Sequence, residues 1–490
     1  MMRILHRSIV GVAGRTYARV DSHSAVSGPW LAACAVALLG GCEGRDDRAG
    51  PAAAEAAAPA DNSSIPAYST GVHGQTTKRW YFFKGRPEGE GPEGVSNLLI
   101  FGGSVYPELS GDVCKLLGMK EGKIDLGRFA DGECRVTIQE TVMGKDVFVV
   151  SPTHTNDSLI ELMLVIATAR RASAERITAV IPFYGYSRQD RRFRREPIAA
   201  ADIALMLEAM GVDRIITIDL HSGQIQGFFS PTTPVDHLTP MGVAAAYLGE
   251  LVTEELRTMG GGLDDTDKLG RGDDVPTKIV VVAPQEGQVG RANAFKSRIE
   301  KYLNVLPVGL AFISRSSTKR FDEDEEVHKH CIGDVKGALC IIVDDLVDTG
   351  STIDNAVRLL TTAGAKKILA FTTHGRFSAD GEQLVQEIPG LERLVICNTL
   401  PHRTPEGKIK DRSRSDKIRE VSVAPLLAEA IYRVHKAMPF AELLAWNDSR
   451  YKGLPPRTLT HANLSDPSFD KVIAPGLPGS FQEADKGKTS

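Results

Sequence analysis

The sequence has few cysteines, and its charges of opposite sign almost balance. Seven cysteines in 490 residues include no C-x-x-C pair, which argues against a disulfide framework and a structural zinc site and favours a reducing compartment. Lys and Arg number 58 and Asp and Glu 62, giving a net charge of -4. Because such a chain has no global field that attracts polyanions, we expect neither nucleic acid nor a membrane surface as a partner.

Long hydrophobic runs are also missing. The apolar stretch at residues 30–42 (WLAACAVALLGGC) is too short to span a bilayer. It belongs to residues 1–76, which are rich in Ala, Gly, Ser and Arg and are predicted to form a low-complexity extension. The extension is open to several interpretations: an Arg-rich organellar transit segment, a signal-type apolar core, or no address at all. Residues 454–490, with several Pro and Gly, are predicted to be a tail.

Between these ends, short β-branched runs alternate with helical patterns. The alternation occurs twice around a Gly- and Asp-rich insertion at 259–275, which predicts two α/β domains at residues 96–245 and 246–440. Uniformly apolar strands predict parallel sheets with both faces covered. The strand candidates are residues 97–103, 146–152, 176–183, 214–221, 278–284, 309–314, 339–345, 367–373 and 393–399.

Helix ends are visible between these strands. One helix is expected to begin at Asn156 or Asp157, whose side chains can cap it, and to run through Ala172. Two further helices are expected to end before Gly211 and Gly364, since glycine commonly follows the last helical turn.

One strand leads into an acidic turn made of small residues. Residues 341–353 read IIVDDLVDTGSTI, with acids at Asp344, Asp345 and Asp348. Ligands of open parallel sheets bind beyond the carboxyl ends of the strands. Small residues let the backbone approach a phosphate, helix N–H groups bind its oxygens, and carboxylates suit ribose hydroxyls or magnesium. A plain acidic turn with a Thr or Ser cap is the alternative, but three acids within five positions favour a sugar-phosphate site.

The segment VDDLVDTGST resembles the phosphoribosyl diphosphate-binding loop of the type I phosphoribosyltransferase fold. Other segments narrow the resemblance to the ribose-phosphate diphosphokinase family, and together they cover nearly all of residues 97–435: GRFADGE, AVIPFYGYSRQDRR, DLHSGQIQGFF, IGDVKG, THGRFS and EVSVAPLLAEAI. The resemblance implies two type I phosphoribosyltransferase-like domains, each a mostly parallel sheet flanked by helices. It also implies transfer of the diphosphoryl group of ATP to ribose 5-phosphate, which feeds nucleotide biosynthesis.

The resemblance also assigns roles to particular residues. The sugar phosphate goes to the acidic loop, the ribose hydroxyls to its acid pair, and ATP to the first domain. These residues are Asp348, Thr349, Gly350, Ser351 and Thr352 for the phosphate, Asp344 and Asp345 for the hydroxyls, and Asp131, Glu133, Arg188 and Gln189 for ATP. A solvated basic face is the alternative for Arg188, Arg191 and Arg192.

His221, at the end of an apolar strand, resembles the family's magnesium-associated histidine, and Asp219 is expected to orient it. A lone His in such a place is otherwise a hydrogen-bonded structural residue. Mg2+ is the cofactor that the resemblance implies, and ATP is the co-substrate.

Two segments depart from the family pattern. Where the family has Ser-Pro-Asp followed by two glycines, residues 283–288 read APQEGQ, so the metal-associated aspartate is replaced by Gln285. Glu286 is the candidate substitute ligand, since a neutral amide binds magnesium poorly. In the catalytic loop, counting from either side gives Lys319 or Arg315 as the cation that stabilises phosphate charge. A charged surface loop without catalytic function is the alternative for this segment.

These departures leave three hypotheses for the function. The first is an active Mg-ATP-dependent ribose-phosphate diphosphokinase, the second is a paralogue that regulates catalytic subunits, and the third is a different sugar-phosphate transferase on the same fold. The resemblance implies a homo-oligomer or a hetero-oligomer with related subunits. It also implies a cytoplasmic location, with a mitochondrion or plastid as the alternative through residues 1–76.

Overall fold

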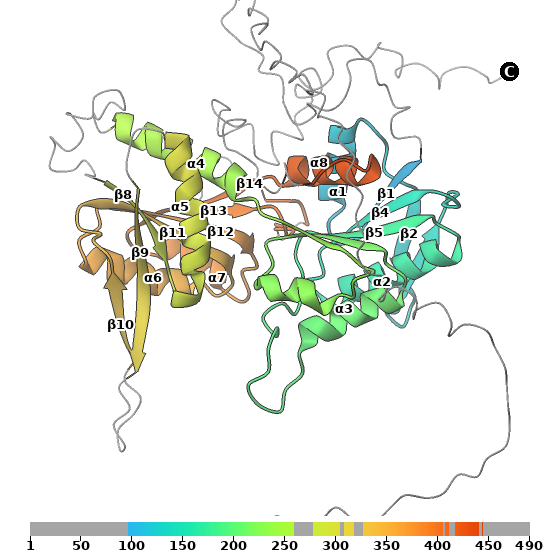
Figure 1. Ribbon diagram of the computed structural model, residues 1–490, viewed down its shortest axis with the longest axis horizontal. Helices are drawn as coiled ribbons and strands as arrows, with labels where there is room; N and C mark the ends of the chain where they lie inside the picture. Colours follow the sequence, from blue (N-terminus) through green and yellow to red (C-terminus); the bar gives the residue numbers. More distant parts are fainter. Residues whose placement is uncertain are drawn as a thin grey trace, which may run out of the picture. The chain divides into compact units, whose positions relative to one another are not determined.

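The computed structural model describes residues 97–258, 278–303, 308–317, 327–404, 407–410, 417–440 and 443. The expectations for residues 1–76, 259–275 and 454–490 lie outside this part of the chain. Two large sheets and one small hairpin make up the strands (Figure 1). Within the described residues, no helix combines the length and the apolar character that crossing a membrane requires.

The first sheet has five strands, and every neighbouring pair is parallel. Alternate side chains of its strands enter two different hydrophobic clusters, as in Leu99 and Ile100. Both faces are therefore covered, and the predicted parallel sheet with uniformly apolar strands is confirmed. In spatial order the strands are β1 (Leu98–Gly102), β4 (Asp146–Val150), β5 (Arg176–Ile181), β6 (Arg214–Ile218) and β7 (Val235–Leu238).

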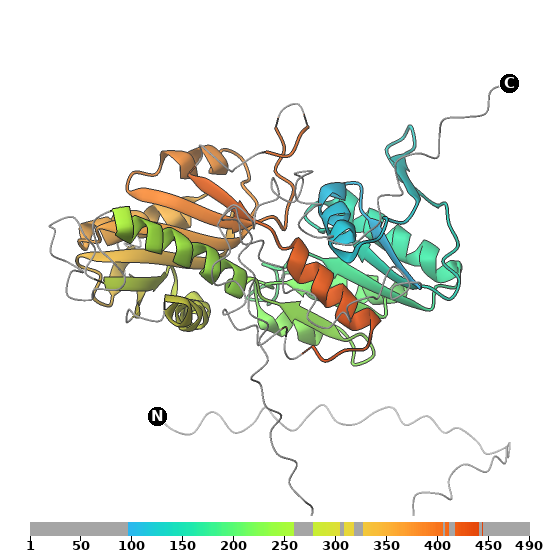
Figure 2. The same cartoon turned by 90° about the horizontal axis from the view of Figure 1, so that it is seen from above.

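Helices cover both faces of this sheet. On one face lie α2 (Asn156–Arg171) and α3 (Ala199–Ala209), and on the other lie α1 (Pro107–Leu117) and α8 (Ala424–His435). Figures 1 and 2 both show α8 beside α1, although the two helices are far apart in the sequence. We call this sheet with its four helices the first lobe.

The cap of α2 differs from the expectation. Thr155, one residue earlier than predicted, is the N-cap: its hydroxyl accepts from the Ser158 N–H at 3.1 Å, and the Ser158 hydroxyl accepts in return from the Thr155 N–H at 3.2 Å. This reciprocal pair satisfies two N–H groups that the helix itself leaves open. The prediction that Asn156 or Asp157 caps the helix was therefore wrong by one residue.

A hairpin of β2 (Ile124–Arg128) and β3 (Cys134–Ile138) was not predicted from the sequence. β3 alternates between half-buried and exposed residues and packs against α2, whereas β2 is half-buried except at Arg128. Five-residue strands with several charged residues carry too little hydrophobic signal to be recognised by their pattern.

The second sheet has seven strands. Six of them are parallel, and the edge strand β10 pairs antiparallel with β9. The expectation of a mostly parallel sheet is confirmed, although β10 and β14 were missed. In spatial order the strands are β10 (Val327–Ile332), β9 (Val308–Ser317), β8 (Lys278–Ala283), β11 (Ala338–Val347), β12 (Lys367–Gly375), β13 (Leu391–Cys397) and β14 (Ile418–Val421).

Two helices pack on each face of the second sheet. They are α4 (Met241–Thr258) and α5 (Val289–Leu303) on one face, and α6 (Ser351–Thr362) and α7 (Gly381–Glu387) on the other. We call this sheet with its four helices the second lobe.

Gly249→Ala should destabilise the protein, although alanine favours helices. A Cβ built at position 249 would lie 2.2 Å from the ring of Tyr302, where α4 packs on α5. Overpacking of this kind costs about 1–3 kcal/mol, against about 1 kcal/mol gained from helix propensity. Gly111→Ala in α1, where a Cβ meets nothing within 4 Å, is the matched control and should stabilise. Denaturant unfolding of both variants measures the effect, and a gain for Gly249→Ala would refute the packing argument.

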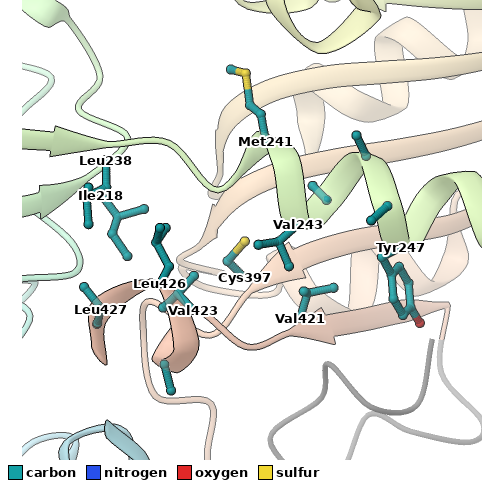
Figure 3. Packing of buried hydrophobic residues seen from close by; sticks show 14 of the residues in the cluster. Ile218, Leu238, Met241, Val243, Tyr247, Cys397, Val421, Val423, Leu426 and Leu427 are labelled. Carbon is teal, nitrogen blue, oxygen red and sulfur yellow. The ribbon is translucent and has the colours of Figure 1, made fainter. Parts of the chain in front are cut away.

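One hydrophobic cluster runs from the first lobe into the second. It joins Ile218 and Leu238 of the first sheet, Met241 at the start of α4, and Leu426 and Leu427 of α8 (Figure 3). Although α8 lies within residues 246–440, it packs against α1 of the first lobe. The predicted domain limits remain a prediction, and packing assigns this last helix to the first lobe.

Candidate functional site

A pocket of about 440 Å³ lies where β11 ends. Residues 344–353 line it together with Gln285, Gly287 and Gln288 from the segment after β8. Arg188, Arg191 and His221 of the first lobe line it as well. The acidic stretch that the sequence singled out therefore forms one wall of a pocket to which both lobes contribute.

The small residues of the stretch form the entry to α6. Gly350 adopts φ 83°, and a Cβ there would meet Leu384 and Val385 at 2.9 Å, so this turn favours glycine. The hydroxyls of Thr349 and Ser351 lie 3.0 Å apart, and both residues line the pocket. Because the first N–H groups of a helix lack intrahelical partners, the start of α6 is suited to bind an anion such as a phosphate.

Asp344 and Asp345, near the end of β11, are both buried. Their pKa values are shifted in opposite directions. Burial and the neighbouring Asp345 charge raise the pKa of Asp344 well above its usual range. Burial also opposes ionisation of Asp345, but the hydrogen bond from His221 and the charge of Arg291 outweigh it and lower the pKa of Asp345. The pair therefore carries one firmly ionised carboxylate beside a carboxyl group that retains its proton more readily.

Asp344→Asn should raise the thermal stability of the ligand-free protein, and the gain should grow with pH. With a folded pKa above the unfolded value of about 3.9, the carboxyl group contributes stability that is fully present below that value and is lost as pH rises through the folded pKa. Asparagine keeps an acceptor for the Asp345 N–H and does not ionise. Melting temperatures of wild type and variant at about pH 5 and about pH 9 test this. An equal difference at both would contradict the raised pKa.

Two side chains of the first lobe reach this wall. Arg188 Nη2 lies 2.9 Å from Asp348 Oδ2, and His221 Nδ1 lies 2.6 Å from Asp345 Oδ2. Burial opposes ionisation of Asp348, but hydrogen bonds from Ser378 and Arg188 lower its pKa. The hydrogen bond with Asp345 raises the pKa of His221. The first lobe thus places an arginine and a histidine opposite the acidic loop.

The partner expected for Asp219 is different in the structure. Its carboxylate contacts Arg291 of α5 and Thr373 of β12, while His221 is held by Asp345. The expectation that Asp219 orients His221 is therefore wrong. Asp219 instead joins the end of β6 in the first lobe to two elements of the second.

Sequence reasoning missed Arg291 and Gln288. Gln288 Nε2 donates to Asp345 Oδ1 at 2.9 Å, and Gln288 Oε1 accepts from Arg291 Nε at 2.9 Å. Gln288 follows the carboxyl end of β8, and that position is the one signal in the sequence that indicates it. Arg291 lies inside a helix, where nothing in the pattern distinguishes it from a surface arginine.

Several predicted site residues are not gathered in the pocket. Asp131 and Glu133 are exposed in the turn of the β2–β3 hairpin, and Gln189 is exposed beside Arg188. The exposed Glu286 accepts from the Ser314 hydroxyl at 2.5 Å and is not among the lining residues. Their roles remain predictions.

The two candidate loop cations cannot be compared side by side. Lys319 lies outside the described residues. The main chain of Arg315 belongs to β9 and is paired with Lys329 of β10, but its side chain is outside the description.

Models of known protein families match this chain in two separate regions. Residues 98–211 match the model of the N-terminal domain of ribose phosphate pyrophosphokinase, and residues 320–444 match the phosphoribosyl synthetase-associated domain. The ribose-phosphate pyrophosphokinase of Clostridium perfringens is 38% identical over 350 residues, which cover 71% of this chain and 97% of the relative. That of Nitrosomonas europaea is 37% identical over 351 residues, which cover 71% and 98%.

A solved structure agrees with these matches. The crystal structure of phosphoribosylpyrophosphate synthetase from Mycobacterium smegmatis has a TM-score of 0.57 and 36% identity, and the match covers 70% of this chain and 100% of that one. The predicted resemblance and the predicted α/β fold class are thereby confirmed. The chain belongs to the ribose-phosphate pyrophosphokinase family.

Proposed function

We propose that this protein is a ribose-phosphate diphosphokinase. It transfers the diphosphoryl group of ATP to the C1 hydroxyl of ribose 5-phosphate and yields 5-phosphoribosyl 1-diphosphate and AMP. The observation that carries the proposal is the shared pocket, in which residues 344–353 face Arg188, Arg191 and His221. The regulatory-subunit alternative is not favoured, because the relatives compared above are named as pyrophosphokinases.

The geometry supports a separate binding role for each part of the pocket. The start of α6 takes the 5-phosphate, and Asp344 and Asp345 take ribose hydroxyls. Arg188 and Arg191 take polyphosphate oxygens, because a guanidinium pairs well with phosphate. Transfer of this kind depends on cations around the polyphosphate and on in-line placement of the sugar hydroxyl, so it needs no protein nucleophile.

Mg2+ is part of this proposal, with ATP as the co-substrate. Among the described residues no group of three or more His, Cys, Asp or Glu side chains is arranged as a metal site. The pocket offers the Asp345 and Asp344 carboxylates and the His221 imidazole. Of these groups the ionised Asp345 carboxylate fits magnesium, which is commonly held by one or two carboxylates together with substrate phosphates. A bound magnesium would spread the charge on the transferred phosphates.

Asp131 and Glu133 connect the proposal to oligomerisation. Both are exposed on the hairpin and do not line the pocket of their own chain. If they contact ATP, as the family resemblance implies, they reach it in a neighbouring subunit. We therefore include a homo-oligomer, or a hetero-oligomer with related subunits, in the proposal. Sedimentation analysis of the full chain tests it, and a monomer at assay concentrations would oppose it.

The decisive experiment follows the products. Purified full-length protein with ATP, ribose 5-phosphate and Mg2+ should release AMP in step with phosphoribosyl diphosphate, and omission of ribose 5-phosphate should stop both. Release of ADP would indicate transfer of a single phosphoryl group. No turnover alone, but altered activity of an added active relative, would support the regulatory subunit.

For location we propose the cytoplasm, by resemblance to the family, with a mitochondrion or plastid as the alternative. Residues 1–76 fused to a fluorescent reporter distinguish the two. A diffuse signal supports the cytoplasm, and an organellar signal assigns a targeting role to the extension.

A further inference from the structure

Gln288 lies in the pocket, but the family resemblance gives it no role. It closes the 3-10 turn η4 (Glu286–Gln288), and its N–H donates to the Gln285 carbonyl at 3.0 Å. The turn sets the side chain, which is half-buried, against the end of β11.

The amide of Gln288 connects two groups of opposite charge. Its Nε2 donates to Asp345 Oδ1 at 2.9 Å, and its Oε1 accepts from Arg291 Nε at 2.9 Å. The orientation of the amide follows from chemistry, because an ionised carboxylate only accepts and a guanidinium only donates. Neither glutamate nor an apolar side chain of the same length makes both bonds.

Gln288 and His221 together hold both oxygens of the Asp345 carboxylate. His221 Nδ1 lies at 2.6 Å from its Oδ2, so each carboxylate oxygen has a donor. Arg291 in turn contacts the buried carboxylate of Asp219 in the first lobe. Gln288 therefore connects the acid pair of the pocket to the contact between the lobes.

We propose that Gln288 is a positioning residue for ribose 5-phosphate, which acts by holding the Asp345 carboxylate in the plane and direction that the sugar hydroxyls require. The inference rests on the proposed function and extends it to a residue outside the resemblance. When Asp345 is misplaced, its hydrogen bonds to the sugar hydroxyls are lost, and the loss of one hydrogen bond to a charged group weakens binding by about 10- to 100-fold.

Gln288→Met keeps the length of the side chain and removes both bonds. In the full-length protein it should weaken ribose 5-phosphate binding by at least about 10-fold in calorimetry. The KM for ribose 5-phosphate should rise by a similar factor, whereas kcat should change little. A merely structural role would lower the active fraction, and hence kcat, at unchanged KM.

Gln288→Glu is the second variant, because it keeps the shape of the side chain but sets a carboxylate against Asp345. It should bind ribose 5-phosphate more weakly than Gln288→Met, whereas a space-filling role predicts wild-type affinity. The matched control is Gln383→Met on α7, where Gln383 Nε2 donates to Glu387 Oε1 at 2.9 Å outside the pocket. This control should bind as wild type does.

The outcomes separate the inference from the proposed function. If wild type binds ribose 5-phosphate and Gln288→Met binds it equally well, the inference is overturned and the function stands. If wild type does not bind ribose 5-phosphate, both the proposed function and the inference are refuted. Weaker binding by Gln383→Met as well would show that the effect is not specific to the pocket and would also overturn the inference.

Discussion

The double variant Asp344→Asn, Asp348→Asn should no longer bind ribose 5-phosphate measurably. Asp344 is the carboxyl group of the acid pair assigned to the sugar hydroxyls, and Asp348 is held by Arg188 and Ser378 beside the start of α6. Each substitution replaces a carboxyl group by a neutral amide, and since a hydrogen bond to a charged group is worth about 1.5–3 kcal/mol, the two losses together weaken binding by about 10²- to 10⁴-fold. Calorimetric titration with ribose 5-phosphate measures the loss without any turnover.

The control for this variant is Asp354→Asn in α6, the helix that follows the acidic loop. Asp354 pairs with Arg358 at 2.9 Å and does not line the pocket, so the same change of charge should leave binding intact. Unchanged affinity in the double variant would mean that the sugar phosphate binds elsewhere, and the placement of the site would have to be abandoned.

Lys319→Ala should lower kcat by about 10²- to 10³-fold, the range found when one group that stabilises transition-state charge is removed. Binding of ribose 5-phosphate should persist. Arg315→Ala should have a much smaller effect, because β9 extends through Ser317 and keeps the Arg315 main chain in a paired strand. Lys319 follows that strand and is the better candidate to approach the reacting phosphates.

Steady-state kinetics of the two variants decide between these cations. Lys329→Ala, on the strand that pairs with Arg315, removes a lysine from the same hairpin and serves as the control. A large loss in Arg315→Ala with near-normal Lys319→Ala would reverse the assignment. Normal kcat in both variants would favour a surface loop without catalytic function.

Strands buried on both faces were predictable because their apolar runs are long and β-branched, as in residues 339–345, which lie within β11. Short strands with polar residues were not, and β7 (Val235–Leu238) shows why: VDHL alternates too briefly to distinguish it from a turn. The antiparallel β10 follows the charged segment 318–326, whose sequence contains neither Gly nor Pro.

The acidic stretch of the site was predictable because its residues are consecutive in the sequence. The bond between His221 and Asp345 was not, because its residues are 124 positions apart and meet only through packing of the lobes. The same holds for Asp219, whose carboxylate faces Arg291 and Thr373. Local patterns identify which residues carry chemistry, and tertiary packing determines which of them meet.

The shared cluster and the return of α8 to α1 bear on how this protein can be divided. The described chain starts on the first lobe at β1 and comes back to it in α8, where Arg176 donates to the Val434 carbonyl at 3.2 Å and His435 lies 2.9 Å from Asp146. A cut between the sheets would remove α8, one of the two helices that cover this face of the first sheet. Neither half is then expected to fold on its own. A shortened version of this protein should therefore contain both sheets together with α8.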